Sequence, residues 1–543
     1  MIVTSRFFPF ALVLAAGLPV LAAIWALLSP PVILSSEMTW DLLFNLSGAW
    51  HLWFGHVPHF DYHEPVGVLT FLLTEAGFRL LGPSPRAVLT GMAIFAAVLF
   101  AVASLVAARR LALLPAALFV VFVCLIVLRP ANVGDHPDAY SFAMAYNRYG
   151  WSAMAVLGLL LFEPPRHRSS ADIIEMACAA LLLAALFYLK MTYFAAGVAT
   201  LAVALVASPH VRERRRGWGV VMTAVLALIA LPFNWPYLAD LIAAARAGIV
   251  RDDAAFFFND FAENAGEYAA WFAAAGLAAW LWRRQQAPLR LAVAAAFLPA
   301  MGLMLLSQNS QAHGIPLAVV TAFLFYAQLQ RLQAPTALTL AVLAFPLASI
   351  FSSATSLVSY HARLGEGYMR IVETTNLKGL AVPMEPEGLL ADVAAGRDRG
   401  RLFGRARAVR PRYELSPYEY VETLMDAVAL LRQSGTANGR IAVLDQVDPL
   451  PFMLGLEPPR GGNIWAGTGA PTRSPEDYLA EVDHVLIPRF TTNFAWTESA
   501  KATYGAYLAE HFPVRRENGS WSVASRNGHN ADRADNEPPQ PQR

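Results

Sequence analysis

Acidic residues at helical spacing open the polar part of the sequence, between Glu37 and Pro65. Glu37, Asp41 and Asn45 are four residues apart, so in a helix they lie on one face, one turn above another. Tryptophans in the same stretch are amphipathic aromatics that favour the headgroup level of a membrane; they are Trp40, Trp50 and Trp53. The spacing therefore predicts a helix on the membrane surface that holds carboxylates over it. A surface anchor with solvated acids would give the same pattern.

Asp41 is the first candidate for a general base. A carboxylate near a partly desolvated surface can have its pKa raised toward the working pH, and it then needs only hydrogen-bond reach to an acceptor hydroxyl. The supporting acids of the same stretch are Glu37, Asp61 and Glu64. Asn45 and His59 are the candidates there for contact with a sugar or an acceptor.

Basic residues at the ends of apolar runs are candidates for binding a lipid phosphate. Arg148 stands between Tyr146 and Tyr149 at the start of such a run, and a guanidinium binds phosphate through paired donors. Lys190 lies in a tight turn between two apolar runs, so its ammonium must sit at the membrane boundary. Tyr149 is a further donor-binding candidate. Snorkelling of Arg148 and capping of a helix C-terminus by Lys190 would explain the same positions without a ligand.

Two other polar segments separate apolar runs. One offers a divalent ion two carboxylates and an imidazole, although an Asp-rich turn that satisfies its own backbone has the same composition. These three residues are Asp135, His136 and Asp138. The turn over 307–314 is dense in neutral donors and acceptors, and its candidates for sugar or acceptor contact are Asn309 and His313. A divalent cation is compatible with the sequence but not required, because basic residues are present for the phosphate.

The composition identifies the class of protein. Of 543 residues, 56% are hydrophobic and 15% are charged, which is too apolar for one soluble domain. The net charge of +1 and the lack of a basic motif argue against nucleic acid as a partner. Cys124 and Cys178 both lie inside apolar runs, so neither a disulfide framework nor a zinc site is expected. The sequence therefore predicts a polytopic α-helical membrane protein.

Eleven apolar runs are long enough to cross a bilayer. They are 7–28, 87–107, 111–128, 149–162, 171–189, 193–208, 218–234, 268–282, 290–306, 315–330 and 337–358. The run over 66–81 is shorter and carries Glu75 and Arg79, and charges at the midplane cost about 3 kcal/mol each on insertion scales. If 66–81 stays outside, most of the loop arginines fall on the side of Arg6, as the positive-inside rule requires of the cytoplasm.

The composition changes near Ser359. Beyond it, strand-like runs alternate with helical patterns, which predicts a small extramembrane α/β domain over 360–525. The strand-like runs are 440–445, 483–488 and 521–525. Residues 526–543, rich in Asn, Asp, Pro and Gln, are expected to form a disordered tail. The membrane domain is then 1–359, and its long first external loop is 30–86.

Residues around 41–86 resemble the GT-C glycosyltransferases. An acid follows the first apolar run, a segment with glycine, histidine and proline spans 55–65, an apolar helix ends at Gly82, and Arg86 opens the second span. Within this family the similarity is to the dolichyl-phosphate-mannose protein mannosyltransferase and lipid A aminoarabinose transferase group. The layout matches over about 5–360.

The resemblance implies many spans, a catalytic acid in the first external loop and a polyprenyl-phosphate-linked sugar as donor. It implies Asp41 as the catalytic acid and Arg86 as the basic residue entering the second span. Arg148 and Lys190 resemble phosphate-binding residues by position. Many relatives have an Asp–Glu pair where this chain has Asp41 followed by Leu42, which leaves the second carboxylate open.

Together these features predict an inverting membrane glycosyltransferase of a bacterial inner membrane. It would move a sugar from a polyprenyl-phosphate carrier to a lipid or glycan acceptor on the periplasmic face, with a cytoplasmic N-terminus and a periplasmic C-terminal domain. A transporter or flippase of lipid-linked sugars would need ionisable residues within the spans, which hold almost none apart from Asp172 and Glu175. A non-catalytic membrane scaffold would leave the polar outer turns without a purpose.

Overall fold

The computed structural model of the chain separates into two compact units. The first consists of Met1–Glu37 and Pro65–Glu366, and the second of Met38–Glu64 and Gly367–Arg543; we name them the helical unit and the mixed unit. The described residues are 8–64, 66–166, 172–247, 261–262, 265–308, 315–363, 367–371, 376–384, 401–402, 405–406, 415–466, 470–491 and 494–526. The predicted tail beyond 526 lies outside them.

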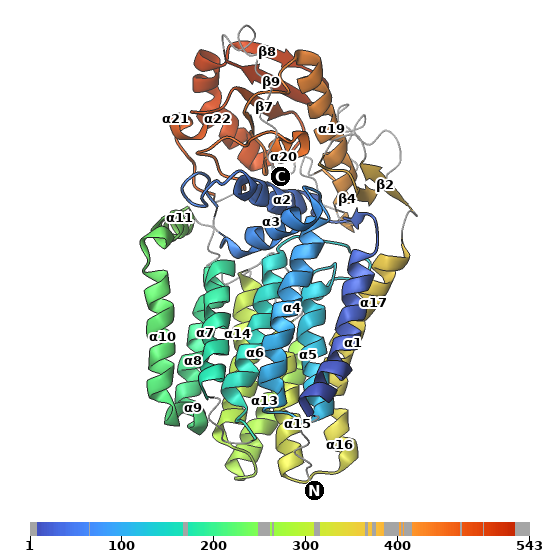
Figure 1. Cartoon of the computed structure of the whole chain (residues 1–543), viewed down its shortest axis with the longest axis vertical. Coiled ribbons are helices and arrows are strands. Elements are labelled where there is room, and N and C mark those ends of the chain that lie inside the picture. Colours follow the sequence, from blue (N-terminus) through green and yellow to red (C-terminus); the bar gives the residue numbers. More distant parts are fainter. Residues whose placement is uncertain are drawn as a thin grey trace. The chain divides into compact units, whose positions relative to one another are not determined.

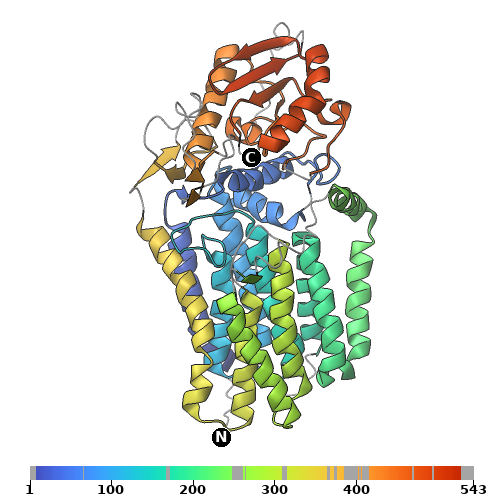
Figure 2. The same cartoon turned by 180° about the vertical axis from the view of Figure 1, so that it is seen from behind.

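Long apolar helices make up the helical unit (Figure 1). They are α1 (Phe8–Leu28), α4 (Ala87–Ala108), α5 (Leu113–Leu128), α6 (Ala145–Phe162), α7 (Asp172–Leu189), α8 (Met191–Ala207), α10 (Arg215–Ile229), α13 (Ala265–Arg283), α14 (Leu289–Ser307), α15 (Pro316–Arg331) and α17 (Ala344–Ala362). The shorter elements are β1 (Ile33–Leu34), α3 (Leu69–Leu81), α9 (Pro209–Glu213), η1 (Pro232–Asn234), α11 (Trp235–Arg246) and α16 (Thr336–Ala341). From behind, the later helices, coloured green to yellow, cover the near face of this unit (Figure 2).

Helices occupy all eleven predicted runs, but the number of spans is not confirmed. Among the described residues, four helices are long and apolar enough to cross a membrane; they are Phe8–Leu28, Ala87–Ala108, Leu289–Ser307 and Thr336–Ala362. Helix α10 and the helical segment Pro232–Arg246 pass the same test only when taken together as one span, and they are bent by 67° at the break between them. The apolar run predicted over 218–234 is broken in the structure: Pro232 lacks an N–H and disfavours helix in the residue before it, and α10 ends at Ile229.

The burial pattern of α1 explains how such helices pack. Only one stripe of α1 is buried, at spacings of three and four residues; it consists of Leu12, Ala16, Val20, Ala23 and Leu27. The outward residues are also large and apolar, for example Leu18 and Trp25, which are 65% and 63% exposed. A helix that is apolar on its exposed side suits lipid better than water. The helical unit is thus that of an integral membrane protein.

Close backbone approach holds α3 against α4. A Cβ on Gly77 would lie 2.3 Å from the carbonyl oxygen of Ala87, and one on Gly91 would lie 2.8 Å from that of Leu73. Only glycine allows the two backbones to come this near. At 13 residues α3 rises about 20 Å, less than the hydrocarbon thickness of a bilayer.

The mixed unit combines a small sheet with helices. Its elements are α2 (Thr39–Trp53), β2 (Tyr368–Ile371), β3 (Leu380–Pro383), β4 (Arg401–Leu402), β5 (Arg405–Ala406), α19 (Pro417–Ser434), β6 (Ile441–Val443), α20 (Leu450–Leu454), α21 (Pro475–Tyr478), β7 (His484–Pro488), α22 (Phe494–His511), β8 (Val514–Glu517) and β9 (Trp521–Ser525). The four-stranded sheet has the order β6-β7-β9-β8, in which only β6 and β7 are parallel. Strands therefore occupy the three predicted strand-like runs.

The local sequence accounts for helix α19, one of the long helices of this unit. Ser416 and Glu419 form a capping box at the start of α19, and Gly435 ends the helix in a left-handed conformation with φ of 69°. Trp521 of β9 is fully buried and donates from Nε1 to the carbonyl oxygen of Thr423 in α19, at 2.5 Å. This bond fixes α19 across the sheet.

Helix α2 packs with the C-terminal residues, a grouping that the predicted boundary near Ser359 does not suggest. Trp50 Nε1 donates to the carbonyl oxygen of Leu456 at 2.7 Å, and Ser47 Oγ donates to that of Asp448 at 2.8 Å. The strand-like segment after α2 continues these contacts through the N–H of His63, which donates to Gly462. The mixed unit thus carries the polar stretch of the first loop.

Candidate active site

Asp41 lies in the first turn of α2. Every residue from Thr39 to His51 is buried except Asp41, which is half-buried. Burial raises the pKa of Asp41 to about 7, even though an acid in the first turn of a helix is stabilised in its charged form by the helix dipole. Its carboxylate has no hydrogen-bond or ion-pair partner among the described residues. The side chain is therefore an isolated acid that changes charge near neutral pH.

The predicted face of α2 is only partly correct. The helix begins at Thr39, and Met38 before it is left-handed with φ of 49°, so Glu37 precedes the helix and belongs to the helical unit. Asp41 and Asn45 remain one turn apart, and Asn45 is buried. Because α2 is buried nearly all round, the structure contradicts the expectation of an amphipathic helix with an exposed polar face.

Glu37 has an acidic neighbour of its own in the helical unit. Burial, followed by the charge of Asp135, raises the pKa of Glu37. Its backbone N–H donates to the carbonyl oxygen of Tyr140 at 3.1 Å, which holds it beside the second external loop. Glu37 and Asp135 thus form an acidic pair within the helical unit.

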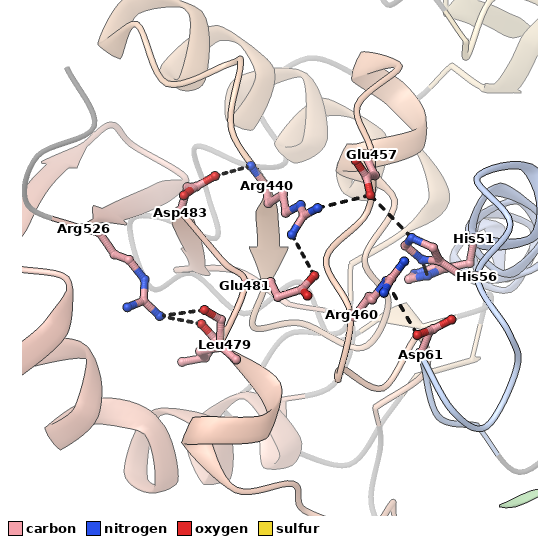
Figure 3. A network of polar contacts seen from close by, with 11 residues as sticks. His51, His56, Asp61, Arg440, Glu457, Arg460, Leu479, Glu481, Asp483 and Arg526 are labelled. Atoms are coloured by element: carbon pink, nitrogen blue, oxygen red, sulfur yellow. Dashed lines mark hydrogen bonds and ion pairs between the residues drawn. The ribbon is translucent and has the colours of Figure 1, made fainter. Parts of the chain in front are cut away.

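The other predicted polar residues of the first loop have local roles in the mixed unit. Asp61 accepts from the N–H of Val57 at 2.7 Å and lies 3.6 Å from Arg460 Nε, so both of its oxygens are used (Figure 3). Glu64 is buried. His59 is buried and left-handed with φ of 67°, and its N–H donates to the carbonyl oxygen of Tyr62 at 2.7 Å. These contacts build the turn after α2.

A histidine pair that the sequence analysis did not single out connects α2 to this turn. Nδ1 of His51 lies 3.0 Å from Nδ1 of His56, and His56 Nε2 lies 3.7 Å from Glu457 (Figure 3). Burial, followed by His56, lowers the pKa of His51, and burial and the Arg460 charge lower that of His56. Both imidazoles are therefore neutral near pH 7, and one can donate to the other.

Two more buried acids lie after β6, beside the residues that hold α2. Burial raises the pKa of Asp445 to about 6 and that of Asp448 to about 8. One carboxylate oxygen of each has no partner among the described residues, and the same is true of the buried Tyr420 hydroxyl. Trp40, next to Asp41, packs edge-on against the Tyr420 ring at 6.2 Å. Asp445, Asp448 and Tyr420 were not among the residues predicted from the sequence.

Arg148 is a buried cation with unused donors in the helical unit. Its Nη1 donates to the carbonyl oxygens of Ala131 and Ser141, both at 3.1 Å, and lies 3.4 Å from Asn132 Oδ1. Its Nε and Nη2 are buried and have no partner among the described residues, and neither does the side-chain amide of Asn147. No described carboxylate forms a hydrogen bond with Arg148. A buried guanidinium with unused donors is suited to binding an anion.

The structure brings Lys190 close to the same helix start. Lys190 precedes α8, and its Nζ lies 5.4 Å from the centre of the Tyr146 ring in α6. The helices meet where Gly150 faces Tyr193: a Cβ on Gly150 would lie 2.7 Å from that ring. Further polar atoms here are buried without a partner in the described part of the chain; they are Trp151 Nε1, Tyr188 hydroxyl and Thr192 Oγ1.

Two predicted phosphate-binding residues make packing contacts. Arg86 precedes α4 and donates from Nη2 to the carbonyl oxygen of Leu28 at 2.6 Å, so it caps the C-terminus of α1. The Tyr149 ring is buried and stacks on Phe95 with centres 4.6 Å apart. The Nε of Arg86 is buried and has no partner among the described residues, so the predicted role of Arg86 with the donor stays a prediction, as does that of Tyr149.

The alternative metal site has no support in the described residues. Asp138 forms an ion pair with Arg363 at 2.6 Å and accepts from the hydroxyl of Ser359, while the side chain of His136 is 77% exposed. In the described part of the chain no group of three or more His, Cys, Asp or Glu side chains could hold a metal. Asn309 and His313 lie outside the described residues.

Comparison with known proteins finds a similar solved structure. No family model and no curated protein matches the chain. Among solved structures it is similar to the crystal structure of ArnT from Cupriavidus metallidurans bound to undecaprenyl phosphate. The identity is 13%, the match covers 94% of this chain and 97% of that one, and the TM-score is 0.45.

Sequence signals existed for some of the residues that were missed. Asn147 stands next to Arg148, and Tyr188 and Thr192 flank Lys190 within the same short turn. Polar residues beside a candidate cation were therefore visible, but nothing in the sequence says that their polar atoms are left without partners. His51 and His56 are five positions apart in the sequence, across the end of α2. Their closeness in the sequence was therefore visible, but the contact between their rings was not.

Proposed function

We propose that this chain is a membrane glycosyltransferase that transfers a sugar from a polyprenyl-phosphate carrier to a hydroxyl or amine of an acceptor. The observation that carries the proposal is Asp41, whose pKa is raised to about 7 by burial and whose carboxylate has no hydrogen-bond or ion-pair partner among the described residues. A general base works best when its pKa lies near the working pH. The resemblance of residues 41–86 to GT-C glycosyltransferases implies a catalytic acid at the same position and supports this role.

In the proposed reaction, Asp41 accepts the acceptor's proton while the acceptor oxygen or nitrogen forms a bond to the anomeric carbon. The bond between that carbon and the phosphate oxygen breaks, and the configuration inverts because attack and departure are on opposite faces. Polyprenyl phosphate leaves with the electron pair. Arg148 and Lys190 stabilise its negative charge, which is the role that the unused donors of Arg148 suit.

The chemistry of the helical unit supports a lipid phosphate as the anion. Arg148 and Lys190 lie at the start of apolar helices, where the headgroup of a membrane lipid would reach them. We place the reaction on the periplasmic face of a bacterial inner membrane, with the N-terminus in the cytoplasm, and we assign it no metal.

A transporter of lipid-linked sugars is less well supported. Its pathway would need an ionisable side chain inside the spans that can change its charge or its partner. Glu175 is such a side chain in α7, but it is held by Arg109, Arg110 and Arg214 at 3.2, 2.9 and 3.1 Å. Because Glu175 already forms ion pairs with three arginines, it is poorly suited to binding or releasing a transported ion.

The test is transfer of radiolabelled sugar from polyprenyl phosphate in membranes with and without the protein. We expect Asp41→Asn to lower the transfer rate by about 10²–10⁴, the usual contribution of a general base, and to leave the protein folded. Asp61→Asn is the matched control from the same segment, and we expect it to keep the rate within about threefold, because Asp61 serves a turn.

Two results would contradict the proposal. Wild-type turnover by purified Asp41→Asn would remove Asp41 as the base. Movement of the labelled lipid across the membrane without any new glycosidic bond would favour a transporter. Thermal unfolding of the purified variants separates a loss of catalysis from a loss of folded protein.

A further inference from the structure

A second group of arginines lies at the opposite end of the helical unit, where α1 begins and where α9 and the link from α15 to α16 are found (Figure 1). Six arginines and two acids from separate connections meet there; they are Arg109, Arg110, Arg166, Arg214, Arg290, Arg331, Glu163 and Glu175. The proposed transfer reaction uses none of them.

The two glutamates hold four of these arginines. Glu175 is 4% exposed and accepts from Arg109, Arg110 and Arg214. Glu163 is 2% exposed and pairs with Arg331. The Nε of Arg110 also donates to the carbonyl oxygen of Glu163 at 2.9 Å. These contacts tie the ends of α4, α6, α7, α10 and α15 together and account for the buried charges.

Arg166 and Arg290 are the two arginines of this group that neither glutamate holds. Neither guanidinium forms an ion pair or a hydrogen bond with a described carboxylate; each interacts with Glu163 only at longer range and is repelled by Arg331. Burial and the charge of Arg331 lower the pKa of Arg166. The Arg166 side chain is exposed and that of Arg290 is half-buried. Both can therefore be reached from outside the protein.

Uncharged donors without partners lie in the same region. Ser208 is fully buried, and neither its Oγ nor the buried Nε2 of His210 has a partner in the described part of the chain. Burial, followed by the charges of Arg110, Arg290 and Arg214, lowers the pKa of His210 to about 3, so its imidazole is neutral. A neutral imidazole can still donate one hydrogen bond to an anion.

We propose that Arg166, Arg290 and Arg331 bind a phosphate-bearing anion, the headgroup of an anionic phospholipid in the leaflet at this end of the unit. Guanidinium groups match the oxygens of a phosphate, and basic clusters between the ends of membrane helices bind such headgroups. Topology alone requires only positive charge in the loops. It does not require that arginines from separate connections meet around Glu163.

The test compares lipids on the full-length protein in detergent, by native mass spectrometry. The probes are phosphatidylglycerol, phosphatidylcholine and inorganic phosphate. We expect wild type to retain phosphatidylglycerol in preference to phosphatidylcholine, and R166Q/R290Q to bind phosphatidylglycerol about tenfold more weakly. The matched control is R215Q/R216Q, which removes the same charge from exposed positions at the start of α10, and we expect its affinity to change less than twofold.

Equal losses in the two double variants would overturn the proposal, because general electrostatic attraction would then explain the binding. Equal retention of the two lipids by wild type would overturn it as well. Displacement of phosphatidylglycerol by millimolar inorganic phosphate would keep the phosphate site but assign it to a free anion. The single variant R166Q alters an exposed side chain, so it preserves the test if R166Q/R290Q does not fold.

Discussion

Two carboxylates of this chain differ in the charged groups around them. Glu175 of the helical unit lies against three arginines, whereas Asp41 of the mixed unit has no partner among the described residues and a pKa raised to about 7 by burial. Cations around a carboxylate favour its charged form, and an isolated carboxylate is favoured as the neutral acid. The first arrangement holds helices together, and the second suits an acid that must exchange a proton.

The arginines show the same contrast. Each guanidinium nitrogen of Arg110 donates to a carbonyl oxygen, and Nη1 also donates to Glu175. Arg148 donates from Nη1 alone, and its other two nitrogens are buried without partners in the described part of the chain. Satisfied donors mark a structural cation, and unsatisfied buried donors mark a place for a ligand.

The largest expected effect on folding comes from Glu175→Gln. Removal of one member of a buried ion pair leaves charges without a partner and costs about 3–5 kcal/mol, and here Arg109, Arg110 and Arg214 lose their shared acid. We expect a correspondingly lower free energy of unfolding in detergent, with unchanged transfer per folded molecule. Glu75→Gln is the control: its partner Arg79 is exposed, and the change should cost less than about 1 kcal/mol. Equal effects would refute the structural role of Glu175.

The helices could be predicted from the sequence because apolar runs of this length have few alternatives. All eleven runs contain helices, and the spacing of Asp41 and Asn45 correctly indicated α2. The start of α2 was not predictable, because the left-handed conformation of Met38 depends on the surrounding structure, and it removes Glu37 from the helix. The bend after Ile229 had a visible cause in Pro232.

Long-range contacts limited the prediction of the candidate site. The bond from Trp50 to Leu456 joins residues 406 positions apart, and no local pattern announces it. Residue type and position singled out Arg148 and Lys190, but whether their neighbours are satisfied depends on packing between α6 and α8. The same reasoning singled out Arg86, and the sequence does not show that this side chain caps α1.

The pH dependence of transfer is the next test of the contrast. Below pH 7 Asp41 is protonated and cannot accept a proton, so kcat/KM should fall about tenfold per pH unit and level off above pH 7. The raised pKa also means that the folded chain binds more protons than the unfolded chain between about pH 4 and 7. The contribution of Asp41 to the unfolding free energy therefore decreases as the pH rises through this range.

Asp41→Asn should abolish both dependences, because an amide does not titrate. Transfer by wild type is measured from pH 5 to 9, and thermal unfolding of both proteins from pH 4 to 8. A rate that is flat down to pH 5 would show that Asp41 is not the base, or that its acid is already ionised there. Glu175→Gln should leave the shape of the rate profile unchanged, since Glu175 takes no part in the proposed transfer.

The smallest expected effect concerns the meeting of α6 and α8 beside Arg148 and Lys190. In Gly150→Ala the new methyl group would lie 2.7 Å from the Tyr193 ring, so the helices must separate. Overpacking of this kind costs about 1–3 kcal/mol, and we expect a raised KM for the polyprenyl donor with a smaller change in kcat. Gly158→Ala, in the same helix, is the matched control, because its Cβ would lie 3.5 Å from Leu298 in ordinary contact. Donor binding by Gly150→Ala that equals that of Gly158→Ala would show that the approach of the two helices does not position the phosphate site, and Arg148 would then have to act without Lys190.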